Sequence, residues 1–106
     1  MAADDTYAEV HVSCGSAGEA AMIGRTLVDE RLAACAQSVP ITSVYWWDGE
    51  IESGEEILLV VKTTAVHVPA VAARITTLHS YDLPAVTWVT GGATPATASW
   101  IADATN

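Results

Sequence analysis

Cys14, His79 and Asp82 are the residues of this chain whose side chains could together bind a metal ion. A thiolate and an imidazole are donors that Cu(I), Cu(II) and Zn(II) prefer, and a carboxylate could complete such a site. Each residue type also has an ordinary structural role. Cys14 could be a small buried hydrophobe, and His79 could interact favourably with the dipole at a helix C-terminus. The residue types alone leave both interpretations open.

Catalytic chemistry has less support from the same residues. Cys14 and His79 could form a nucleophile and its base, but no third residue that would orient them is evident. Ala17 stands where a Cys-x-x-Cys chelate would need its second cysteine, and the segment Gly15–Gly18 contains no Lys or Arg to hold a phosphate. We therefore expect that the protein is not an enzyme and that it has no organic cofactor.

The first half of the chain predicts a strand and a helix. The segment Tyr7–Cys14 alternates between apolar and polar residues, which is the period of a β-strand. Ser16 and Glu19 match a capping box, so a helix should begin there. Its apolar stripe recurs at steps of three and four residues as far as Cys35, and Pro40 prevents further extension.

The second half predicts a hairpin, a second helix and two further elements. Asp48 and Gly49 separate two β-prone runs, and both residue types tolerate the positive φ angles of a tight hairpin turn. Thr94 and Pro95 suit the N-cap and first position of a short helix. In chain order, the predicted elements are strands over Ile41–Trp47 and Glu50–Thr63, a helix over Ala65–His79, a strand over Ala85–Thr90 and a helix from Pro95 to about Ala102.

This order of elements is βαββαβ with a short C-terminal helix, which predicts an α+β, ferredoxin-like fold with an antiparallel sheet and both helices on one face. The length of 106 residues fits a single domain over residues 1–106, in which 1–6 would be a flexible tail. In this topology the first strand and the second helix end at the same edge of the sheet, which brings Cys14 and His79 together. About 18 helical residues would carry Cys35 about 27 Å away, so we expect no disulfide between the two cysteines.

The charge of the chain excludes some partners. Thirteen acidic side chains stand against 4 Lys and Arg, and the formal net charge is -9. Nucleic acids and anionic membranes are therefore not expected partners, whereas cations are attracted. Five acidic residues surround the predicted hairpin turn, where we expect a solvated edge that binds cations weakly: Asp48, Glu50, Glu52, Glu55 and Glu56.

Location and assembly can also be anticipated. The first six residues lack the basic and apolar segments of a secretory signal, and the longest apolar run, Ile57–Val61, is far shorter than the roughly 20 residues of a membrane-spanning helix. We expect a cytoplasmic protein. The strand that contains this run is apolar on both faces, and the short chain has nothing left to cover the second face, so another subunit should cover it.

Five ordered motifs together resemble the CutA divalent-cation tolerance family: Arg31–Cys35, Ser43–Gly49, Lys62–Thr64, His79–Pro84 and Ser99–Ile101. The resemblance implies a ferredoxin-like protomer, a homotrimer with extended hairpins, and binding of copper or another divalent metal ion. In architecture the family also resembles PII-type signalling trimers. An alternative function is therefore that of a trimeric signalling or scaffold protein with a ligand in the clefts between subunits.

Overall fold

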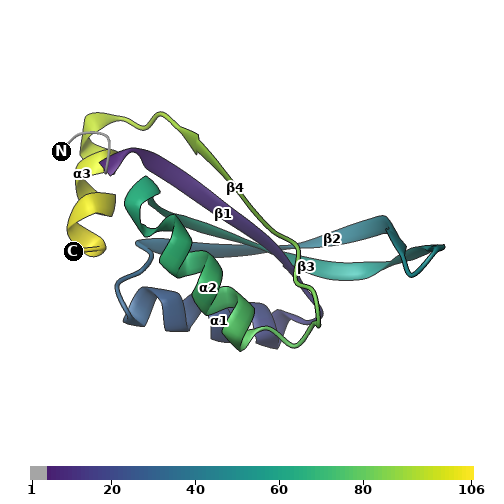
Figure 1. The fold of residues 1–106 in the computed structure, drawn as a ribbon. Coiled ribbons are helices and arrows are strands. Elements are labelled where there is room, and N and C mark those ends of the chain that lie inside the picture. Colours follow the sequence, from purple (N-terminus) through teal and green to yellow (C-terminus); the bar gives the residue numbers. More distant parts are fainter. Residues whose placement is uncertain (1–4) are drawn as a thin grey trace.

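The computed structural model describes residues 5–106 and confirms the ferredoxin-like α+β fold. The sheet has the order β2-β3-β1-β4 with antiparallel neighbours, and α1 and α2 lie on one of its faces (Figure 1). The elements are β1 (Tyr7–Cys14), α1 (Ala17–Asp29), β2 (Cys35–Trp47), β3 (Glu50–Thr64), the 3-10 turn η2 (Ala65–His67), α2 (Val68–Leu78), β4 (Val86–Gly91) and α3 (Pro95–Ala104).

The predicted flexible tail over residues 1–6 falls largely on residues 1–4, which lie outside the described part of the chain. Thr6 is described, and its carbonyl oxygen accepts a hydrogen bond of 2.7 Å from the backbone N–H of Ala65. This bond joins the start of β1 to the turn that precedes α2.

The core lies between the sheet and the two helices. Alternate residues of β1 are fully buried, as the period of the segment predicts. Cys14 is the last of them and is packed as part of the core, which fits its interpretation as a small hydrophobe. The large side chains packed into this core from the other elements include Ile23, Leu27, Leu59, Val61, Val71 and Ile75.

The helix α1 ends six residues before Cys35, so the prediction of a helix as far as Cys35 was wrong. Arg31 has a φ of 58°, in the left-handed region. The N–H of Leu32 then donates to the carbonyl of Leu27 at 3.0 Å, and the N–H of Arg31 donates to that of Val28 at 3.1 Å. These two bonds form a Schellman motif, whose left-handed position is usually glycine. Because an arginine occupies this position, no glycine marks the end of the helix in the sequence.

Cys35 instead begins β2, and Pro40 lies within this strand. A proline is tolerated there because β2 is an edge strand and one side of its backbone needs no partner. Cys35 pairs with Lys62 of β3, whereas Cys14 pairs with Ile57, and this offset corresponds to about 17 Å along the strand. Both cysteines are free, as predicted, although the reason is strand register and not helix length.

The β2–β3 hairpin extends well beyond the rest of the sheet. Asp48 and Gly49 have positive φ angles of 52° and 80°, so the predicted tight turn is confirmed. Because β1 ends at Cys14 opposite Ile57, residues 50–56 of β3 pair only with β2. They form a two-stranded ribbon that projects away from the helices (Figure 1) and contributes to a longest molecular dimension of 45 Å.

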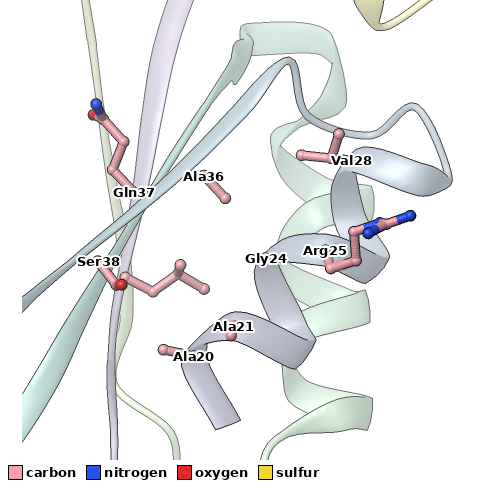
Figure 2. Close-up of a pocket in the computed structure, with 9 residues that line it drawn as sticks. Ala20, Ala21, Gly24, Arg25, Val28, Ala36, Gln37 and Ser38 are labelled. Atoms are coloured by element: carbon pink, nitrogen blue, oxygen red, sulfur yellow. The ribbon is translucent and has the colours of Figure 1, made fainter. Parts of the chain in front are cut away.

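A shallow hollow of about 240 Å³ separates α1 from the edge of β2 (Figure 2). Gly24 faces Ala36 here, and a Cβ atom on Gly24 would lie only 2.9 Å from that of Ala36. The glycine therefore lets the helix approach the strand. Arg25 borders the hollow, and its guanidinium binds Asp29 on the same helix. None of the described residues that line the hollow is Cys, His, Asp or Glu.

Candidate metal centre

Cys14, Glu19 and His79 bring a sulfur, a carboxylate oxygen and an imidazole nitrogen within 4.8 Å of one another. They come from the end of β1, the first turn of α1 and the residue that follows α2. The predicted proximity of Cys14 and His79 is confirmed. The sequence pattern indicated only a helix-capping role for Glu19. A capping glutamate points back toward the turn before its helix, and because that turn follows Cys14, the capping box was the signal that could have placed Glu19 near the site.

Glu19 joins two connections of the fold. Its Oε1 accepts a hydrogen bond of 3.1 Å from the N–H of Gly15, and its Oε2 accepts one of 2.8 Å from the N–H of Ser80. Burial raises the pKa of Glu19, but the hydrogen bonds from Ser80 and Gly15 outweigh it, so the pKa lies below its ordinary value. The carboxylate is therefore charged at neutral pH.

His79 has hydrogen bonds at both ring nitrogens. Its Nε2–H donates to the carbonyl oxygen of Ser13 at 2.8 Å, and its Nδ1 accepts from the N–H of Tyr81 at 3.1 Å. These partners fix the neutral tautomer that carries its proton on Nε2. The side chain is fully buried, and Nδ1 lies 3.9 Å from Oε2 of Glu19. Nδ1 is the nitrogen that faces the cluster, so coordination there would replace the hydrogen bond from Tyr81.

Cys14 is a protonated thiol in the resting protein. Burial raises the pKa of Cys14 to about 11, with further contributions from the negative charges of Glu19 and Glu56. A thiolate is the form that binds metals, so metal binding must release this proton. The donor set of sulfur, nitrogen and oxygen suits copper or zinc, whereas magnesium and calcium prefer oxygen ligands alone.

Asp82 does not belong to this group of three. It lines a larger cavity of about 910 Å³ between the β2 arm of the β2–β3 ribbon and the connection from α2 to β4. Tyr81 lines the same cavity and donates a hydrogen bond of 2.9 Å from its hydroxyl to Oε2 of Glu56. The Tyr81 ring also packs on His79 at a centroid distance of 4.6 Å, so it separates the buried cluster from the cavity.

A comparison with known proteins assigns the family. The profile of the CutA1 divalent ion tolerance protein matches residues 8–104. The chain belongs to the CutA1 family. A CutA structure from Xylella fastidiosa superposes with a TM-score of 0.92 and 38% identity, covering 95% of this chain and 99% of that one. The periplasmic divalent cation tolerance protein CutA from Archaeoglobus fulgidus has a TM-score of 0.92 at 28% identity, covering 94% and 99%.

Curated CutA proteins agree with this assignment. The divalent-cation tolerance protein CutA from Thermus thermophilus is 46% identical over 65 residues, which are 60% of this chain and 63% of that protein. The Archaeoglobus fulgidus protein is 34% identical over 77 residues, 73% of this chain and 76% of its own length. The match to human CutA spans 42% of that protein. No helix within residues 5–106 is long and apolar enough to cross a membrane.

Proposed function

We propose that this CutA1-family protein is a homotrimer that takes part in divalent-cation tolerance by binding copper, or an ion of similar preference, through Cys14 and His79. The single observation that supports this most is the approach of Cys14, Glu19 and His79 to within 4.8 Å. Glu19 is the proposed carboxylate ligand, because its oxygen lies within 4.8 Å of the donor atoms of Cys14 and His79. Asp82 is the alternative, because it follows closely after His79 on the same connection.

The protein's own residues would exchange protons and hydrogen bonds on binding. The Cys14 thiol must lose its proton, and Nδ1 of His79 must give up the N–H of Tyr81. Glu19 is already ionised, and its two backbone partners hold it in place. Nε2 of His79 keeps its bond to Ser13, which would orient the ring in the way that outer hydrogen bonds orient metal-binding histidines.

A competition titration tests the metal site. The purified protein is titrated with Cu(I), Cu(II) and Zn(II) against chelators of known affinity, and thiolate-to-metal absorption is recorded. Cys14→Ser should abolish that absorption and weaken binding about tenfold or more. Cys35→Ser is the matched control, because Cys35 is the other free thiol and lies outside the cluster.

Two further variants identify the carboxylate. Glu19→Gln should weaken binding if Glu19 is the ligand, whereas Asp82→Asn should do so if Asp82 is. Each variant removes one negative charge, so the two are matched in electrostatics. Equal affinity for copper in wild type, Cys14→Ser and His79→Ala, with all three folded by circular dichroism, would show that the cluster is a structural network only.

The exposed surface of the ribbon supports the proposed trimer. Val44, Trp46 and Ile51 point to one face of the ribbon, where Trp46 pairs with Ile51. Their exposed fractions are 71%, 72% and 62%. A contiguous apolar surface of this kind marks an interaction site, and a ribbon with a free backbone edge suits contact with another copy.

Light scattering tests the assembly. The wild type should have three times the mass of one chain, 11.1 kDa, at micromolar concentration. Trp46→Glu should shift the mass toward the monomer, since it places a charge on the contact surface. Val66→Glu is the control, because Val66 is 55% exposed but lies on η2, at the opposite end of β3 from the ribbon. A monomeric wild type would refute the trimer.

Two further features of the proposal concern chemistry and location. A protonated, buried Cys14 thiol is a poor nucleophile, but it can become a metal ligand when a metal ion displaces its proton, which supports a function without catalysis.

Free cysteines fit the reducing environment of the cytoplasm, where we place the protein. Its relative from Archaeoglobus fulgidus is described as periplasmic, so fractionation of cells is the direct test.

A further inference from the structure

The open cavity beside the ribbon has the volume of a small-molecule site. Its volume of about 910 Å³ lies at the upper end of the range of ordinary ligand pockets. Its walls come from four parts of the chain that are distant in sequence, namely the end of β1, the ribbon strands of β2 and β3, and the connection between α2 and β4. It is separate from the buried cluster of Cys14, Glu19 and His79.

Aromatic rings form much of the wall. Tyr45, Trp47 and Tyr81 line the cavity, and their exposed fractions are 46%, 49% and 39%. Tyr45 and Trp47 alternate along β2, so their side chains point to the same face of the ribbon. Val44 and Trp46, which lie between and beside them, also border the cavity, so the proposed trimer contact would adjoin this site. Ring faces carry negative charge in their π system and attract cations.

Carboxylates lie among these rings. Glu56 and Asp82 line the cavity itself. On the face that carries Tyr45 and Trp47, the cross-strand partners are Glu52 and Glu50. The hydroxyl of Tyr81 donates to Glu56 and holds this carboxylate toward the cavity. The site therefore combines aromatic faces with fixed negative charge.

The basic side chains of the chain lie elsewhere. None of the described lining residues is Lys or Arg. Arg25 binds Asp29, and Arg74 binds Glu30. Arg31 donates to the carbonyl oxygen of Ala104, at the C-terminal end of α3. Lys62 pairs across the strands with Glu9 and Cys35, distant from the ribbon.

We propose that this cavity binds a small organic cation, in which an ammonium group lies against the rings of Tyr45, Trp47 and Tyr81 and is neutralised by Glu56 and Asp82. The faces of the rings supply no ligand atom to a metal ion, and the Tyr81 hydroxyl already binds Glu56. A quaternary or alkylated ammonium is weakly hydrated, so it gains more from contact with aromatic faces. Its apolar groups would cover ring surface that water now contacts.

Choline is a suitable probe, because 3,3-dimethylbutan-1-ol has the same shape without the charge. Binding to the full chain is measured by calorimetry and by the chemical shifts of the tryptophan side chains, at constant ionic strength. We expect choline to bind and the neutral alcohol to bind about tenfold more weakly or not at all, a difference equivalent to one cation–aromatic contact. Equal binding of the two probes would overturn the proposal, as would the absence of choline binding at tens of millimolar.

Two matched variants locate the site. Glu56→Gln removes the carboxylate that Tyr81 holds, and choline binding should weaken about fivefold to tenfold. Glu55→Gln removes the same charge from the neighbouring residue, which points to the opposite face of β3 and does not line the cavity. It should change binding less than twofold. Equal effects of the two variants would mean that only the overall charge of the protein attracts the cation, and the proposed site would be wrong. Light scattering on each variant verifies that assembly is unchanged.

Discussion

The Nε2–H of His79 donates to the carbonyl oxygen of Ser13 across 2.8 Å, and this bond joins the residue after α2 to the penultimate residue of β1. The same ring accepts the N–H of Tyr81 at its other nitrogen. One buried side chain thus binds a strand carbonyl and a loop amide. The histidine stabilises the fold in the resting protein, and only Nδ1 could be released to bind a metal ion.

His79→Ala should therefore destabilise the protein even without metal. It removes two hydrogen bonds to partly buried backbone groups and opens a cavity beside Tyr81, so we expect a loss of about 2 to 4 kcal/mol in the free energy of unfolding. Urea denaturation in the presence of a chelator measures this. Thr77→Ala, at an exposed residue in the last turn of α2, should change it by less than about 0.5 kcal/mol. A loss that appears only with metal present would contradict the structural role.

Gly24→Ala should also destabilise the protein, by about 1 to 3 kcal/mol. The added methyl group would lie 2.9 Å from the Cβ of Ala36, so α1 would have to move away from β2 (Figure 2). Gly18→Ala is the matched control in the same helix. Its added Cβ would meet only the Ser16 hydroxyl, at 4.0 Å, so this substitution should be neutral or stabilising by about 0.5 to 1 kcal/mol. Thermal and urea unfolding compare the two.

A second substitution tests the cause of that loss. Ala36→Gly removes the group that the new methyl group would meet, so the double variant Gly24→Ala with Ala36→Gly should recover part of the stability. The two residues are in contact, and their effects should therefore not be additive. Strict additivity would mean that the close approach is not what requires glycine at position 24.

The reactivity of Cys14 follows from its burial. Because burial raises the pKa of Cys14 to about 11, the thiolate is scarce at pH 7. In the Cys35→Ser variant, labelling with a thiol reagent should be about 100-fold slower in the native protein than in urea. Bound copper or zinc should slow it further. Rapid labelling in the native state would show that the end of β1 opens readily and that the cluster is not rigid.

The sequence predicted those parts of the fold that depend on local periodicity. The alternation in Tyr7–Cys14 and the turn at Asp48 and Gly49 were placed correctly, because strand period and positive φ are encoded in residue types. The end of α1 was missed, since an arginine occupies the left-handed position where glycine is the usual signal. The extension of β2 back to Cys35 was missed with it. Pro40 was interpreted as the limit of the preceding helix, but it lies within β2, because an edge strand tolerates proline.

The candidate site was predictable in topology but not in detail. Strand and helix ends placed Cys14 beside His79, which required only the order of the elements. The participation of Glu19 depends on how its side chain turns between Gly15 and Ser80, and Ser80 is distant in the sequence. The cavity lined by Tyr45 and Tyr81 depends on the twist of the ribbon against a loop, and no period in the sequence encodes that.

Acid stability provides the last prediction, through Glu9 on the sheet face opposite the helices. The Tyr7 hydroxyl and the His11 ring both hydrogen-bond to this carboxylate, and in that order they lower the pKa of Glu9 below its ordinary value of 4.5. A carboxyl whose pKa is lower in the folded state stabilises the protein above pH 4.5, and that contribution is lost as the pH falls through the folded pKa.

The test compares unfolding free energies at pH 7 and near pH 3, at one protein concentration. The wild type should lose more stability on acidification than Glu9→Gln, whose amide does not titrate. Glu55→Gln is the control, because Glu55 is exposed and its side chain makes no hydrogen bond within residues 5–106. It should lose as much stability on acidification as the wild type. If Glu9→Gln instead matches the wild type at both pH values, Tyr7 and His11 do not stabilise the ionised carboxylate.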